Sequence, residues 1–229
     1  MLLMERGPGF RTKPIKTSYS SCAGTAYVIM ENVKVPVEHL IGAFSGIFAF
    51  FFYLIISVGT ENQGFPVIMF NFNHERWLIV CQSIRMTRLV VEECFKWAVI
   101  RKAFGKPLAA QPVIRHKLAM MVAQVEGVQN WLDNITHQMN KMSYKEQSVK
   151  LAGPIALLKL YATKVGTAVS DESCQIFGGR AITQTGMGQV IERYHRATKF
   201  AAILGGSEEI MADLGIKQAI KQFPKTARL

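Results

Sequence analysis

The sequence contains few cysteines, and no pair of them has the spacing that metal sites and redox motifs use. The four cysteines are Cys22, Cys81, Cys94 and Cys174. None belongs to a Cys-x-x-Cys motif, and His74 and His116 also lack metal-ligand spacing. We therefore expect no metal site, and we interpret the cysteines as buried free thiols of a reducing compartment.

Acidic residues are also scarce. The chain has 27 Lys and Arg against 16 Asp and Glu, which gives a formal net charge of +11 over 229 residues. Such a charge favours anionic partners: nucleic acid, a membrane surface or a nucleotide-bearing substrate. No block of about five or six like charges occurs, so a scattered basic surface is the alternative. No basic–aromatic interleaving or groove-reading motif is present, and we expect no nucleic-acid binding.

Charge is missing altogether from residues 40–60, LIGAFSGIFAFFFYLIISVGT. A stretch of about 20 apolar residues is long enough to cross a bilayer as a helix. A membrane span is therefore one prediction for this stretch, and a buried element is a second. A third is an insertion over residues 43–59 that does not belong to the fold.

The residues before the apolar stretch have the pattern of β structure. AYVIM (26–30) and VKV (33–35) are strand-like runs, and they are split by the turn pair Glu31 and Asn32. So few strands do not form an independently stable sheet. We therefore expect residues 1–42 to be the end of a β domain whose first part is missing.

The residues after the stretch have the pattern of long helices. Within 71–100, polar residues form one stripe and apolar residues a wider one, which is typical of a helix buried on two sides. Further helices are predicted to open at Pro112, to cover about 145–174, and to begin after Gly205 and Gly206. The predicted fold is therefore mainly α: a C-terminal antiparallel four-helix-type bundle in residues 61–229, preceded by the short β remnant.

Seven short motifs stand in an order and at a spacing typical of one enzyme family. They are KTSYS (16–20), VKVPVEHLIG (33–42), ENQGF (61–65), FNHERW (72–77), RKAFGKPL (101–108), QIFGGRA (175–181) and LGGSEEIM (204–211). Each motif alone is weak, but together they resemble the acyl-CoA dehydrogenase family. The resemblance covers nearly the whole chain except the apolar stretch. It implies the end of the family's middle β domain followed by its C-terminal helical domain.

The resemblance implies a flavin-dependent α,β-dehydrogenation of an acyl-CoA thioester, with FAD as the cofactor. In this family a carboxylate removes the α-proton while the β-hydrogen leaves as hydride. Most members place the carboxylate where this chain has Gly205. The branch that resembles long-chain and isovaleryl-CoA dehydrogenases has a small residue there and a glutamate at the position of Glu75. The resemblance therefore implies that Glu75 is the catalytic base, and a glutamate that only interacts with the helix dipole is the alternative.

The resemblance also implies where the ligands bind. The expected contacts to acyl-CoA are Phe72, Asn73, Arg76 and Gly205. The expected contacts to FAD, shared across a subunit boundary, are Arg101, Phe104, Gln175, Gly178 and Gly179. The implied assembly is a homodimer or homotetramer. The implied electron acceptor is an electron-transfer flavoprotein in a mitochondrion, or oxygen in a peroxisome.

The chain also departs from the family pattern. It lacks the family's N-terminal helical domain and the first part of the β domain, which carry the main contacts to the flavin ring. An inactive fragment, a non-catalytic helical oligomerisation module and a single-span membrane protein are therefore the alternatives to an active dehydrogenase. The last residues, Ala227, Arg228 and Leu229, resemble a peroxisomal address. We expect the peroxisome, with the mitochondrion as the alternative.

Overall fold

The computed structural model describes residues 1–20, 23–41 and 61–224. The chain divides into two units, Met1–Phe72 and Asn73–Leu229, and each is described by itself. The predicted boundaries at residues 42 and 60 stay predictions, because residues 42–60 lie outside the described part. The same holds for the C-terminal tripeptide 227–229.

The first unit contains one antiparallel hairpin. Strand β1 (Phe10–Pro14) pairs with β2 (Ala26–Met30), so that Phe10 lies opposite Met30. The strand prediction for 26–30 is confirmed, but the strand prediction for 33–35 is wrong. The Glu31 N–H donates to the Gly9 carbonyl at 2.9 Å and extends the strand pairing by one residue at the open end of the hairpin. Asn32 then takes a left-handed φ of 54°, which turns the chain away from the sheet.

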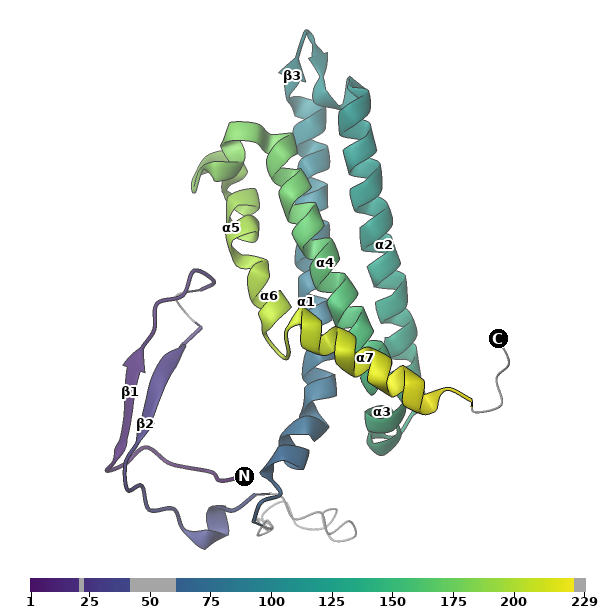
Figure 1. Ribbon diagram of the computed structural model, residues 1–229. Helices are drawn as coiled ribbons and strands as arrows, with labels where there is room; N and C mark the ends of the chain where they lie inside the picture. The colour runs from purple at the N-terminus through teal and green to yellow at the C-terminus, as the bar shows by residue number, and fades with distance from the viewer. Residues whose placement is uncertain (21–22, 42–60, 225–229) are drawn as a thin grey trace. The chain divides into compact units, whose positions relative to one another are not determined.

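Helices make up most of the described part of the chain, and the predicted mainly α fold is confirmed. The longer ones are α1 (Gly64–Ile100), α2 (Pro112–Lys141) and α4 (Ala152–Phe177). The shorter ones are α3 (Tyr144–Lys150), α5 (Gln189–Ala197), α6 (Lys199–Ile203) and α7 (Glu208–Gln222). Two short strands, β3 (Lys102–Ala103) and β4 (Lys106–Pro107), form a hairpin between α1 and α2. Figure 1 shows α1, α2 and α4 side by side as an antiparallel bundle, with α5 and α6 beside α4.

Local sequence explains where α2 and α3 begin. Pro112 starts α2, where its missing N–H is not needed. Ser143 and Glu146 form the capping box that starts α3. The helix predicted for 145–174, with a kink or start at Gly153 and Pro154, is divided close to that point, since α3 ends at Lys150 and α4 begins at Ala152. The first long helix begins at Gly64, about two turns earlier than predicted. The segment 64–70 is apolar all round and therefore shows no helical periodicity.

One hydrophobic core lies between the long helices. Its side chains come from α1, α2, α4 and α5 and include Val80, Met121, Leu158 and Ile191. The free thiol of Cys94 belongs to this core, and burial raises its pKa to about 12. Within the described residues, no helix is both long and apolar enough to cross a membrane. The span predicted for 40–60 falls almost wholly outside these residues.

Two glycines let α7 cross α4 at short range, as Figure 1 shows for the two ribbons. A Cβ atom at Gly215 would lie 2.4 Å from Leu157 Cδ2, and one at Gly153 would lie 2.9 Å from Gln218 Cβ. Both distances are too short for carbon–carbon contact. The crossing therefore depends on the missing side chains, and it fixes where α7 and the turn before it lie.

We predict that Gly215→Ala lowers the free energy of unfolding by about 1–3 kcal/mol, because the new methyl group overpacks the contact with Leu157. The matched control is Gly127→Ala on α2, where the new Cβ would meet only Tyr161 Oη at 3.7 Å. That change should raise stability slightly, since alanine is the better helix former. Urea unfolding followed by circular dichroism measures both. Equal effects of the two substitutions would contradict the close crossing.

Candidate active site

Glu75 lies within α1, about three turns after the helix begins. Only the first turn of a helix interacts strongly with an acidic side chain through the dipole. The structure therefore excludes the dipole interpretation of this residue. Its side chain is half-buried, and its carboxylate makes no hydrogen bond within the described part of the chain. Its charge acts on two cationic neighbours, Arg76 and Lys159.

The side chain of Arg76 joins α1 to the turn before α7. It is 6% exposed, and its Nε donates to the carbonyl oxygen of Gly205 at 2.8 Å. A terminal N–H of the guanidinium donates to Asn73 Oδ1 at 3.3 Å. Burial lowers the pKa of Arg76, and the carboxylate of Glu75 opposes this effect. The structure thus brings together three residues expected at the acyl-CoA site: Asn73, Arg76 and Gly205. Phe72 precedes them on α1 and is half-buried.

Gly205 and Gly206 form a turn that excludes side chains. Their φ values are +66° and +116°, which favour glycine. A Cβ at Gly205 would lie 2.9 Å from Ile79 Cδ1, and one at Gly206 would lie 2.5 Å from Met211 Cε. Among the described residues, neither glycine N–H has an acceptor. The turn therefore presents unused N–H donors next to α1, which suits a ligand oxygen that carries negative charge.

Lys159 of α4 holds the same turn, and the sequence analysis missed it. The side chain is fully buried, and its Nζ donates to the carbonyl oxygen of Gly206 at 2.7 Å. Burial lowers the pKa of Lys159 to about 8; Arg76 adds to this effect, while Glu208 and Glu75 oppose it. The available signal was a single lysine inside the apolar run IALLKLYA (155–162).

Glu208 anchors the first turn of α7 behind the glycine turn. Its carboxylate is 6% exposed, accepts a hydrogen bond from Thr163 Oγ1 at 3.0 Å, and pairs with Lys164 at 2.8 Å. Lys199 lies 3.7 Å away. Burial raises the pKa of Glu208, but the hydrogen bonds from Lys164 and Thr163 and the charge of Lys199 outweigh it, so that the pKa is lowered overall.

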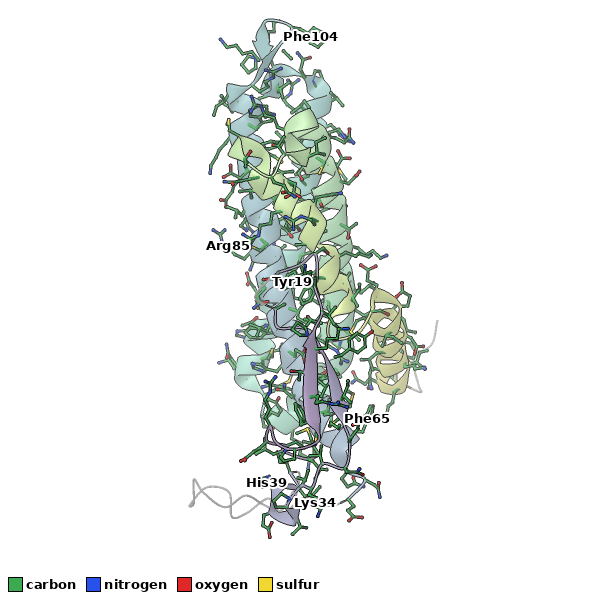
Figure 2. All side chains as sticks on the ribbon, turned by 90° about the vertical axis from the view of Figure 1, so that its left-hand side faces the viewer. Tyr19, Lys34, His39, Phe65, Arg85 and Phe104 are labelled. Atoms are coloured by element: carbon green, nitrogen blue, oxygen red, sulfur yellow. The ribbon has the colours of Figure 1, made fainter. Side chains whose placement is uncertain are left out.

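The residues expected to bind FAD lie at the other end of the helical unit. Arg101 directly follows α1, and Phe104 lies at the tip of the β3–β4 hairpin, 96% exposed (Figure 2). Gln175, Gly178 and Gly179 lie at the exposed C-terminal end of α4. The C-terminal ends of α1 and α4 are in contact, because Trp97 stacks on Phe177 with ring centroids 5.2 Å apart.

Glu75 and Arg101 are about 40 Å apart along α1 at 1.5 Å per residue. One chain therefore does not bring both groups of residues to a single reacting atom. The described residues also contain no group of His, Cys, Asp and Glu that could hold a metal ion.

Comparison with known proteins identifies the family. The model of the acyl-CoA dehydrogenase C-terminal domain matches residues 62–220. The acyl-CoA dehydrogenase apdG of Emericella nidulans is 33% identical over 216 residues, which cover 94% of this chain and 45% of that protein. The mitochondrial short-chain specific acyl-CoA dehydrogenase of Mus musculus is 28% identical, over 82% of this chain and 39% of that protein. The chain therefore belongs to the acyl-CoA dehydrogenase family, as the motifs indicated.

The fold is shared with solved structures of the same family. The butyryl-CoA dehydrogenase of Megasphaera elsdenii superposes with a TM-score of 0.77 at 23% identity, over 96% of this chain and 51% of that one. At this identity the similarity concerns the fold. The chain spans about half the length of the curated relatives it matches, 45% and 46% for the first two.

We predict that Glu208→Gln lowers the free energy of unfolding by about 1–3 kcal/mol near pH 7, because charge-assisted hydrogen bonds become weaker neutral ones. A carboxylate with a lowered pKa stabilises the fold above its unfolded pKa of about 4.5. The difference between the two proteins should therefore shrink as the pH falls below that value. Thermal unfolding between about pH 3 and pH 7 measures it. The control is Asp171→Asn on α4, an exposed carboxylate that has no hydrogen bond or ion pair within the described part of the chain. A pH-independent difference for Glu208→Gln would contradict the prediction.

Proposed function

We propose that the protein acts in α,β-dehydrogenation of an acyl-CoA thioester, with Glu75 as the base that removes the α-proton. The observation that carries this proposal is that the charge of Glu75 acts on Arg76 and Lys159, the two cations that hold the Gly205–Gly206 turn. Glu75 has a carboxylate without a hydrogen-bond donor in the described part of the chain, and the neighbouring turn has two N–H groups without acceptors. A base beside oxyanion donors is the arrangement that proton abstraction next to a carbonyl requires.

The position of Glu75 fits the absence of a carboxylate at Gly205. The space that a side chain at Gly205 would enter is filled by Ile79 Cδ1 at 2.9 Å, with Arg76 Cγ at 3.6 Å. The turn therefore leaves the base to α1. In the proposed reaction Glu75 takes the α-proton, and the Gly205 N–H binds the thioester oxygen while it gains negative charge. Arg76 holds the carbonyl side of the same turn.

The residues at the other end of the unit fit FAD. Arg101 has no carboxylate partner among the described residues, and a guanidinium is suited to a diphosphate. Gly178 and Gly179 have open space where a Cβ would be, so a ligand can approach their backbone. Arg180 lies over the Trp97 ring at 5.3 Å and adds charge to this end. Phe104 presents an exposed ring to an adenine. Bound FAD would supply the hydride acceptor for the β-hydrogen.

The separation of the two groups of residues favours an assembly in which chains share sites. We propose a homodimer or homotetramer in which Arg101, Phe104, Gln175, Gly178 and Gly179 serve a neighbouring chain. An electron-transfer flavoprotein or oxygen is the proposed acceptor. The mitochondrial relative supports a mitochondrion as the compartment, while the C-terminal tripeptide supports a peroxisome.

A second candidate function is a non-catalytic helical oligomerisation module. It is favoured by the distance of about 40 Å along α1 between Glu75 and Arg101, because one chain does not bring the two groups of residues together. The two candidates differ in one observable property, since the module assembles without bound FAD.

We predict that Glu75→Gln abolishes the bleaching of flavin absorbance on addition of an acyl-CoA, while flavin stays bound. Removing a general base costs about 100-fold to 10,000-fold in rate. Stopped-flow absorbance under anaerobic conditions, with the 229-residue protein reconstituted with FAD, measures the loss. The control is Glu92→Gln, an exposed carboxylate on the same helix. Full-rate bleaching in the Glu75 variant would remove the assigned role, and a chain that oligomerises without taking up FAD would favour the module.

We predict that Arg101→Ala lowers the ratio of bound FAD to protein, because the diphosphate loses its cationic partner. Loss of a charge-assisted hydrogen bond of this kind costs about 1.5–3 kcal/mol, which corresponds to roughly a tenfold to a hundredfold weaker affinity for FAD. The flavin spectrum after gel filtration measures the ratio. Figure 2 labels the matched control, Arg85, on the outer side of α1, where Arg85→Ala should leave it unchanged. Equal flavin content in both variants would place FAD elsewhere.

A further inference from the structure

Lys159 is the most deeply buried charged residue of the described chain. Its side chain has no exposed surface, although it lies in a helix whose neighbouring residues are apolar. Burying an ammonium group is unfavourable unless the charge is paired or hydrogen-bonded. Its one hydrogen-bond acceptor among the described residues is the carbonyl oxygen of Gly206. A purely apolar side chain would fill the same space without this penalty, so the ammonium group needs an explanation.

Two cations from different helices donate hydrogen bonds to the carbonyl oxygens of the turn, and this explains the buried ammonium group. Arg76 Nε donates to the Gly205 oxygen and Lys159 Nζ donates to the next oxygen along the chain, at 2.8 and 2.7 Å. In a planar trans peptide the C=O and N–H point in opposite directions. The Gly205 oxygen shares its peptide with the Gly206 N–H, and the Gly206 oxygen shares its peptide with the Ser207 N–H. Arg76 on α1 and Lys159 on α4 therefore fix the orientation of two successive peptides, one from each helix.

We propose that Lys159 is a positioning residue: through the Gly206 carbonyl it fixes the Gly205–Gly206 turn in place, and so holds the Gly205 N–H where it can bind the thioester oxygen. This inference rests on the proposed function, in which that oxygen gains negative charge. Lys159 acts through the turn and does not itself touch substrate. The geometry supports the link directly, since Lys159 Cε lies 3.8 Å from the place where a Cβ of Gly205 would be.

The charge of Lys159 is expected to change within an accessible pH range. The charged groups that act on it are Arg76 and Glu75 on α1 and Glu208 on α7, and with burial as the largest cause the pKa is lowered to about 8. Below that pH the ammonium is charged and binds the Gly206 oxygen strongly. Above it the neutral amine is a weaker donor. The carbonyl of Gly206 should therefore respond to pH around this value, which a lysine that only fills space would not cause.

A single resonance can report this response. Gly206–Ser207 is the only Gly–Ser pair in the sequence. Labelling glycine carbonyls with carbon-13 and serine nitrogens with nitrogen-15 therefore gives one carbon–nitrogen correlation, which belongs to the peptide that Lys159 contacts. We expect this signal in the 229-residue protein to titrate with a midpoint near the pKa of about 8. Lys159→Met should remove the titration, and Lys217→Met, on the exposed side of α7, should retain it.

The conservative variant separates positioning from packing. Lys159→Arg keeps a positive charge that does not titrate in this range, so the resonance should be pH-independent and the turn only partly fixed. In the active enzyme this variant should lower kcat about 100-fold with little change in KM, as misplaced catalytic groups do. The wild-type titration needs no variant, so a Lys159→Met protein that does not fold leaves the test intact.

The outcomes distinguish this inference from the proposed function. A Gly206 carbonyl that does not titrate in the wild type, or that titrates unchanged in Lys159→Met, overturns the role of Lys159. So does unchanged kcat in Lys159→Arg. The spectroscopic measurement needs neither flavin nor activity. A third outcome is a Gly206 carbonyl that titrates as expected while Glu75→Gln bleaches flavin at the full rate. This result would contradict the proposed role of Glu75, but the contact of Lys159 with the turn would remain supported.

Discussion

Two buried cations hold two successive carbonyl oxygens of one glycine turn, and the arrangement of the helical unit depends on this contact. Arg76 reaches Gly205 across 129 positions of the sequence, and Lys159 reaches Gly206 across 47. Each cation would be costly to bury without its acceptor. The turn therefore cannot move away from α1 or α4 without leaving a buried charge unpaired, and this couples the end of the chain to the two central helices.

The packing of α7 on α4 and the charge of Glu208 also fix the position of the turn. Gly153 and Gly215 allow α7 to cross α4 closely, and Glu208 anchors the first turn of α7 to Thr163 and Lys164 of α4. The turn directly precedes α7, so any shift of that helix would change the direction of the turn's N–H groups. The crossing of α4 and α7 therefore helps to position the glycine turn that the proposed reaction uses.

Much of the fold follows from the sequence, because periodicity and helix-capping residues are local signals. The stripes of α1, the proline at the start of α2 and the glycine pair before α7 all predicted real elements. The start of α1 was missed because its first turns are apolar all round. The strand predicted at 33–35 failed because its β-branched residues have no strand partner within the described residues. Lys159 was missed for a different reason. A periodicity argument treats lysine as solvent-facing, and only the three-dimensional contact with Gly206 shows otherwise.

The sequence predicted the candidate site only where the residue type at one position is linked to the residue type at another. Glu75 and Gly205 were paired because a carboxylate at one position goes with a small residue at the other, and the structure supplies a physical reason for that dependence. Arg76, Ile79 and Lys159 occupy the space around Gly205, and the turn's positive φ disfavours a side chain there. Ile79 and the positive φ disfavour a side chain at Gly205, while Arg76 and Lys159 hold the two carbonyl oxygens of the turn. A base carried by α1 and an oxyanion site formed by the turn are then two consequences of one arrangement.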